Sequence, residues 1–101
     1  MGDLERDIQS TACERIENEL GVESVKLETP GETGWPDKLF VMPGVPFLIE
    51  FKRVGEGPRK KQAHIHRKLR AMGWEIECHD TVQGAVDAVR AALIRRGVKC
   101  S

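Results

Sequence analysis

The chain has 101 residues and a mass of 11.3 kDa, so we expect one domain over residues 1–101. Hydrophobic residues make up 40% and charged residues 32%, which is typical of a folded globular chain and not of a disordered one. The apolar runs are short and the first residues are acidic, so the sequence predicts neither a membrane span nor a secretory signal. Lys+Arg and Asp+Glu both number 16, a formal net charge of zero, which alone argues weakly against a nucleic-acid partner.

The charges are unevenly distributed along the chain. Residues 1–51 carry 11 acidic and 4 basic side chains, a net charge of −7, whereas residues 52–70 carry 8 basic side chains and 1 acidic one, a net charge of +7. Electrostatic fields act over about 10 Å at ordinary salt, so the blocks matter more than their sum. The basic block is either a solvated helix face or a surface for an acidic partner.

The cysteines and histidines show no pattern of a metal site or of a disulfide framework. Cys13, Cys78 and Cys100 are odd in number, far apart and without a C-x-x-C pair, so we expect reduced thiols in a cytoplasmic protein. His64 and His66 are two residues apart in an expected helix, so they point to different sides and cannot bind one ion together.

The first predicted element is an amphipathic helix, because apolar residues recur at every fourth position from Leu4 to Leu20, between an N-cap at Asp3 and a stop at Gly21. Alternating or helical patterns between Gly- and Pro-containing breaks predict the other elements. They are strands over residues 22–28, 38–42, 47–54 and 74–78, a helix over residues 58–72 between the last two strands, and a final helix that starts at residue 82 and closes at Gly97. The predicted order is αβββαβ plus a C-terminal helix, an α/β fold.

The cap of the final helix and the apolar stripes of the first and final helices also carry predictions. Asp80, followed by Gln83 three residues later, resembles a capping box for the final helix. The apolar stripes of the first and the final helix either pack on the sheet or supply a dimer interface.

The third predicted strand is apolar nearly throughout but carries two charged side chains. Glu50 and Lys52 are two residues apart, so both leave the same face of the strand. A hairpin turn before this strand brings Asp37, at the start of the preceding strand, close to them. Two carboxylates that share a site favour Mg²⁺ or Mn²⁺, and a neighbouring lysine suits metal-assisted phosphodiester hydrolysis. The alternative is an ordinary ion pair between Glu50 and Lys52 near a strand end.

These motifs resemble a known family of enzymes. The motif G-x-P-D over residues 34–37, the motif E-x-K over residues 50–52, and Gln62 in the following helix are similar to the PD-(D/E)xK nuclease superfamily. More narrowly, nearly the whole chain resembles the VRR-NUC (virus-type replication-repair nuclease) domain in its short, stand-alone phage or bacterial form. The resemblance implies a mixed sheet flanked by helices.

The resemblance also implies roles for individual residues. Asp37 and Glu50 would be metal ligands, with the carbonyl of Phe51 as an additional ligand. Lys52 would be the catalytic lysine that positions the attacking water. Gln62 would hydrogen-bond the lysine, the water or the phosphate, unless it is an exposed polar residue of the helix.

A glutamate of the first helix also belongs to the family's site. Glu5 fits best, ahead of Glu14 and Glu17, and the alternative is that Glu5 stabilises the helix dipole. The basic block begins at the catalytic lysine, and its members nearest the scissile bond would bind DNA phosphates: Arg53, Arg59, Lys60 and Lys61. The sequence has no helix-turn-helix or zinc-finger pattern, so we expect recognition of backbone and shape.

We therefore expect a Mg²⁺- or Mn²⁺-dependent DNA endonuclease in the cytoplasm of a phage's bacterial host. Stand-alone members of the family look like homodimers that act on branched DNA such as Holliday junctions, and two symmetric cuts suit a two-fold dimer. Two alternatives remain: a non-catalytic DNA-binding or assembly module that keeps the nuclease fold, and a nuclease that acts on flaps, linear ends or RNA.

Overall fold

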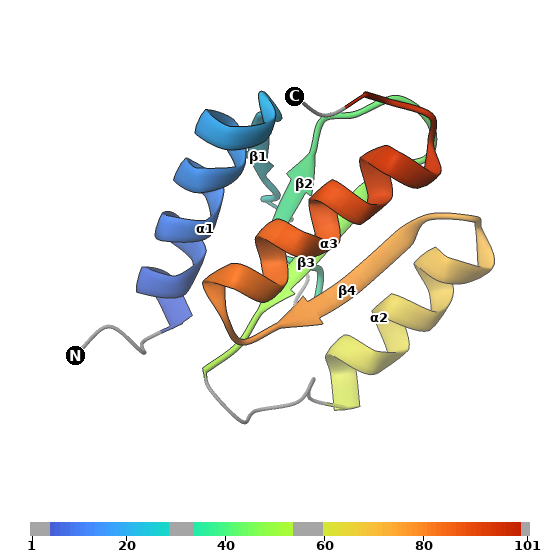
Figure 1. The fold of residues 1–101 in the computed structure, drawn as a ribbon. Coiled ribbons are helices and arrows are strands. Elements are labelled where there is room, and N and C mark those ends of the chain that lie inside the picture. Colours follow the sequence, from blue (N-terminus) through green and yellow to red (C-terminus); the bar gives the residue numbers. More distant parts are fainter. Residues whose placement is uncertain (1–4, 29–33, 54–59, 100–101) are drawn as a thin grey trace.

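A computed structural model describes residues 5–28, 34–53 and 60–99 of the chain. Within these ranges the elements follow the order predicted from the sequence (Figure 1). They are α1 (Glu5–Leu20), β1 (Ser24–Lys26), β2 (Lys38–Phe40), β3 (Phe47–Phe51), α2 (Lys60–Ala71), β4 (Glu75–His79) and α3 (Val82–Arg95). The predicted N-cap Asp3 lies outside the described residues. Within the described residues the first three strands are shorter than predicted, ending at Lys26, Phe40 and Phe51.

The four strands form one sheet in the order β1-β2-β3-β4. β1, β2 and β3 pair antiparallel, whereas β3 and β4 pair parallel. A parallel pair needs a crossover connection, and α2 supplies it. The predicted hairpin turn lies between β2 and β3, where Gly44 has a φ of 99°, a conformation that favours glycine. The expected α/β fold with a mixed sheet is confirmed.

The central strand β3 is buried on both faces. Phe47, Ile49 and Phe51 point to one face and belong to the larger hydrophobic cluster, which α1 and α3 cover (Figure 1). Leu48 points to the opposite face, where it packs with Leu69 of α2 and Ile76 of β4. Because side chains alternate along a strand, Glu50 and Lys52 leave β3 on the same face as Leu48, toward α2.

The apolar stripes of α1 and α3 are buried against the sheet in this packing. Their buried members are Ile8, Ala12 and Ile16 in α1, and Val86, Val89 and Leu93 in α3. Of the two alternatives for these stripes, the structure supports packing on the sheet, since the phenylalanine-lined face of β3 needs an apolar cover. A dimer interface built from these stripes is therefore wrong.

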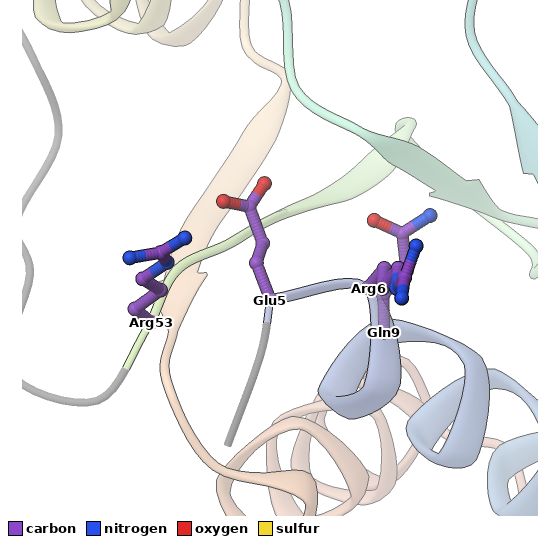
Figure 2. A pocket seen from close by; sticks show the side chains of 4 residues that line it. All are labelled: Glu5, Arg6, Gln9 and Arg53. Carbon is purple, nitrogen blue, oxygen red and sulfur yellow. The ribbon is translucent and has the colours of Figure 1, made fainter. Parts of the chain in front are cut away.

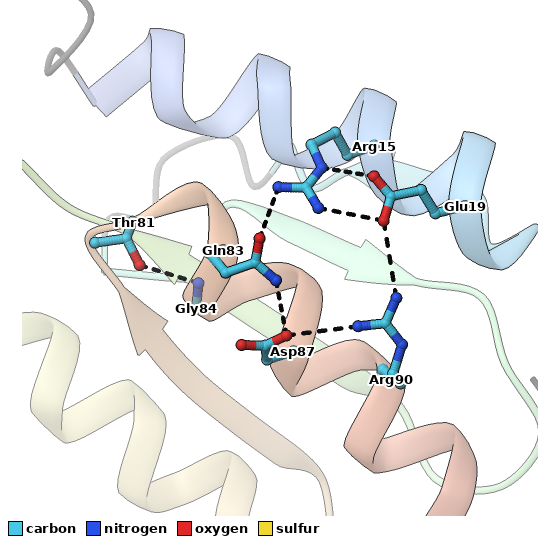
Figure 3. Close-up of polar contacts among 7 residues, drawn as sticks. All are labelled: Arg15, Glu19, Thr81, Gln83, Gly84, Asp87 and Arg90. Atoms are coloured by element: carbon cyan, nitrogen blue, oxygen red, sulfur yellow. Dashed lines mark hydrogen bonds and ion pairs between the residues drawn. The ribbon is translucent and has the colours of Figure 1, made fainter.

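On the solvent side, a polar network joins α1 to α3 (Figure 3). Arg15 pairs with Glu19 at 2.6 Å and donates to Gln83 Oε1 at 3.0 Å. Arg90 of α3 pairs with Glu19 at 3.8 Å and with Asp87 at 3.5 Å. Exposed pairs of this kind contribute at most about 1 kcal/mol each, so the network adds little to the stability of the fold.

The N-terminus of α3 is capped differently from the sequence prediction. The side chain of Thr81 accepts from the backbone N–H of Gly84 at 3.0 Å (Figure 3), so the predicted capping box of Asp80 and Gln83 is wrong. Gln83 instead donates to Asp87, one turn further along α3, at 2.9 Å. Within the described residues, no helix is both long and apolar enough to cross a bilayer.

Candidate active site

Three carboxylates from three elements meet at the end of the sheet where β3 terminates. Glu50 belongs to β3, Asp37 directly precedes β2, and Glu5 is the first residue of α1. One oxygen from each carboxylate lies within 4.8 Å of the others. Lys38 pairs with Ile49 in the antiparallel register, so Asp37 and Glu50 occupy the next rung.

Asp37 is held in place by the backbone of the neighbouring strand. The N–H of Phe51 donates to Asp37 Oδ2 at 2.7 Å. A hydrogen bond from a backbone N–H to a carboxylate is charge-assisted, so this contact anchors Asp37 to β3. The structure thus brings the predicted Asp37 and Glu50 together as the hairpin implied.

Lys52 and Gln62 complete a connected polar group around Glu50. Lys52 Nζ lies 3.6 Å from Glu50 Oε2 and donates a hydrogen bond to Gln62 Oε1. Gln62 Nε2 donates in turn to Glu50 Oε2 at 3.0 Å. Gln62 is therefore not an exposed polar residue of the helix: it bridges the lysine and the glutamate, and α2 positions it there.

Glu50 is buried, with 2% of its surface exposed, and so is Lys52, at 5%. The pKa of Glu50 is raised to about 8, mainly by burial and next by the negative charge of Asp37, while Lys52 opposes both. Adjacent carboxylates cannot all be ionised without a compensating positive charge. A divalent cation supplies that charge, so the cluster of Glu5, Asp37 and Glu50 could bind a divalent metal ion.

His66 is a neighbour of the site that the sequence prediction missed. It lies one helical turn after Gln62 and is 1% exposed, with its Nε2 3.9 Å from Glu50 Oε1. Burial, assisted by Arg70 and Lys52, lowers the pKa of His66, so the ring is neutral near pH 7. The spacing of four from Gln62 was the available signal, because residues i and i+4 share one face of a helix.

A pocket of about 420 Å³ adjoins the carboxylate cluster and is lined by Glu5, Arg6, Gln9 and Arg53. Figure 2 shows Glu5 between Arg53 on one side and Arg6 with Gln9 on the other. Arg53 was predicted to bind DNA, whereas Arg6 and Gln9 were not considered. The spacing of four residues between Glu5 and Gln9 was the available signal for Gln9, since residues i and i+4 share one face of a helix, whereas the spacing of Arg6 gave no such signal.

Some predicted residues are not placed at the site. The structure brings Glu5 to the cluster, whereas Glu14 and Glu17 are exposed on α1. Arg59 lies outside the described residues, as do the side chains of Lys60 and Lys61. The roles predicted for these three basic residues and for the carbonyl of Phe51 stay predictions.

A solved structure described as a VRR_NUC domain aligns with this fold at a TM-score of 0.71. The alignment has 29% sequence identity and covers 90% of this chain and 94% of that one. The chain folds as a VRR-NUC domain. The resemblance to a VRR-NUC domain is thereby confirmed. No family model and no curated protein matches the sequence. The VRR-NUC fold that this chain shares is a nuclease fold.

Proposed function

We propose that this VRR-NUC domain, a single domain over residues 1–101, is a Mg²⁺- or Mn²⁺-dependent endonuclease that hydrolyses DNA phosphodiester bonds. The observation that carries the proposal is the convergence of the Glu5, Asp37 and Glu50 carboxylates beside Lys52 in a nuclease fold. All three acidic side chains offer hard oxygen donors, and this donor set fits Mg²⁺ or Mn²⁺ better than zinc or copper.

The residues of the site have separate roles in hydrolysis. Glu5, Asp37 and Glu50 would hold the cation, which would supply Lewis-acid activation of the phosphate. Lys52 positions the attacking water and stabilises the negative charge that develops on the phosphate. Gln62 binds both Lys52 and Glu50, so it fixes the distance between the lysine and the carboxylate cluster.

The pocket beside the cluster is proposed to bind the DNA backbone. Arg6 and Arg53 provide guanidinium groups and Gln9 provides an amide at its lining, and such groups are common partners of phosphate oxygens. Glu5 belongs to both the pocket and the cluster, so a phosphate in the pocket lies next to the scissile one. This contact is proposed to extend along the DNA strand through three further basic residues, Arg59, Lys60 and Lys61.

The contribution of Arg53 is measurable from the salt dependence of DNA binding. Arg53→Ala is expected to weaken binding and to reduce the slope of log K against log salt by about 0.9, the value for one lost phosphate contact on duplex DNA. Lys99→Ala is the matched control: Lys99 follows α3 at the opposite end of β3, where Arg96 contacts the carbonyls of Pro43 and Val45. Equal slopes for the two variants would show that Arg53 faces solvent in the complex.

We propose that the substrate is branched DNA, such as a Holliday junction, and that the active form is a homodimer. The described residues of one chain form one carboxylate cluster, and two symmetric cuts call for two clusters related by a two-fold axis.

The proposed location is the cytoplasm of a bacterial host. Free thiols at Cys13 and Cys78 fit this compartment, where cysteines stay reduced.

The proposal is tested with labelled four-way junctions, flaps, linear duplexes and RNA, each with Mg²⁺, with Mn²⁺ or with EDTA. We expect metal-dependent cleavage that is fastest on the junction, together with a dimer in sedimentation velocity. Preferred cleavage of flaps, linear ends or RNA would show that the proposed substrate is wrong and would leave the proposed nuclease activity standing. Binding of DNA without cleavage under every metal condition would favour the non-catalytic module.

A further inference from the structure

Two buried polar atoms without hydrogen-bond partners lie where α2 covers the site, one on α2 and one on β3. Among the buried side-chain atoms of the described residues, two have no hydrogen-bond partner, and they are Glu50 Oε1 and His66 Nε2. They face each other at 3.9 Å, which is beyond the 2.7–3.2 Å of a hydrogen bond. A buried polar atom without a partner destabilises the fold, so two such atoms side by side require an explanation.

The two oxygens of Glu50 differ in what surrounds them. Oε2 accepts from Gln62 at 3.0 Å and lies 3.6 Å from Lys52 Nζ. Oε1 has neither contact and points toward the ring of His66. A carboxylate that binds a cation is ionised and only accepts hydrogen bonds, so Oε1 can then accept one from a donor other than Gln62 and Lys52, which both contact Oε2.

We propose that His66 is a positioning residue of the metal site: its Nε2–H donates to Glu50 Oε1 when the carboxylate holds the cation. This inference rests on the proposed function. The atoms need to approach by about 1 Å to reach hydrogen-bond distance, which a small rotation of the glutamate side chain provides. Gln62 and His66, one turn apart on α2, then hold one oxygen each, and the orientation of Glu50 is fixed from a single helix.

The test compares Mn²⁺ affinity, measured by calorimetry, in the wild type, His66→Phe and His66→Gln. Phenylalanine keeps a buried ring but removes the donor, and it is expected to weaken Mn²⁺ binding by about 10–100-fold, as lost support of a metal ligand does. Glutamine places an amide N–H near the position of Nε2 and is expected to restore most of the affinity. His64→Phe, at an exposed position of the same helix, is the matched control and should bind like the wild type.

The outcomes separate this inference from the proposed function. Absence of Mn²⁺ binding in the wild type would overturn both. Equal affinity in the wild type and a folded His66→Phe protein would overturn the role of His66 and leave the nuclease intact. Failure of glutamine to restore the affinity that a folded His66→Phe protein loses would also overturn it, because a packing defect would then explain the loss.

A second measurement needs no variant and applies even if His66→Phe does not fold. Nitrogen-15 NMR of the imidazole in the Mg²⁺-bound wild type reports which ring nitrogen carries the proton. We expect the Nε2-protonated tautomer, with an N–H signal that exchanges slowly with water. The Nδ1-protonated tautomer would overturn the inference, since Nε2 would have no proton to donate.

Discussion

Lys52→Met is expected to reduce the cleavage rate by about 10²–10³-fold, the usual effect of removing one group that stabilises charge in a transition state. Methionine is similar in length and apolar, so it fits the buried position, where 5% of Lys52 is exposed. The substitution removes the positive charge beside Glu50 and the donor to Gln62. The cleavage rate is measured at saturating DNA, so that binding and chemistry are separated.

Two controls accompany this prediction. Lys26→Met, at an exposed position of β1, should cleave like the wild type, and DNA affinity of Lys52→Met should stay close to the wild-type value, because Lys52 is buried. Thermal unfolding checks that the variant is folded. A folded Lys52→Met protein with the wild-type rate would show that another group positions the water.

The sequence predicts the centre of this site because the relevant spacing is local. Strand periodicity is two, so Glu50 and Lys52 must share a face wherever the strand lies. The hairpin at residues 43–44 then determines the register that sets Asp37 opposite Glu50. The order of elements follows in the same way from hydrophobic periodicity and from the glycine and proline breaks.

Features that depend on how a helix is placed against the sheet were beyond the sequence patterns. The first helix carries several glutamates, and its rotation and height over the sheet decide that Glu5 meets the carboxylates while Glu14 stays exposed. The same holds for α2, whose helical pattern gives the spacing of Gln62 and His66 but not the strand residue they face. The cap at Thr81 was missed because Asp80 is an equally good capping residue by type.

Glu50→Gln is expected to stabilise the metal-free protein at pH 8 and to abolish cleavage. In the folded wild type the pKa of Glu50 is raised to about 8, against an ordinary value of 4.5, mainly by burial. Between these two values the folded protein keeps a proton that the unfolded chain has lost, so the free energy of unfolding falls as the pH rises. The slope from this group is at most about 1.4 kcal/mol per pH unit, and glutamine, which is neutral at every pH, removes it.

The measurement is urea unfolding of the wild type and Glu50→Gln in EDTA, at pH 5 and at pH 8. The difference between the two proteins isolates Glu50, because His66 contributes with the opposite sign in both: its lowered pKa makes stability rise toward pH 6.5. Glu14→Gln, at an exposed site on α1, should show the wild-type pH dependence. If the free energy of unfolding depends on pH equally in the wild type and in Glu50→Gln, then Glu50 is ionised in the metal-free fold.

Addition of Mg²⁺ links this stability effect to the proposed chemistry. The cation takes the place of the proton on Glu50, so it should stabilise the wild type more at pH 8 than at pH 5, where proton and metal compete. The glutamine variant lacks one of the three carboxylates of the cluster and should gain little stability from Mg²⁺ at either pH. We therefore expect Glu50→Gln to be more stable than the wild type without metal, to gain less stability from Mg²⁺ and to be inactive on DNA. This result would show that the buried carboxylate of Glu50 serves metal binding and not folding.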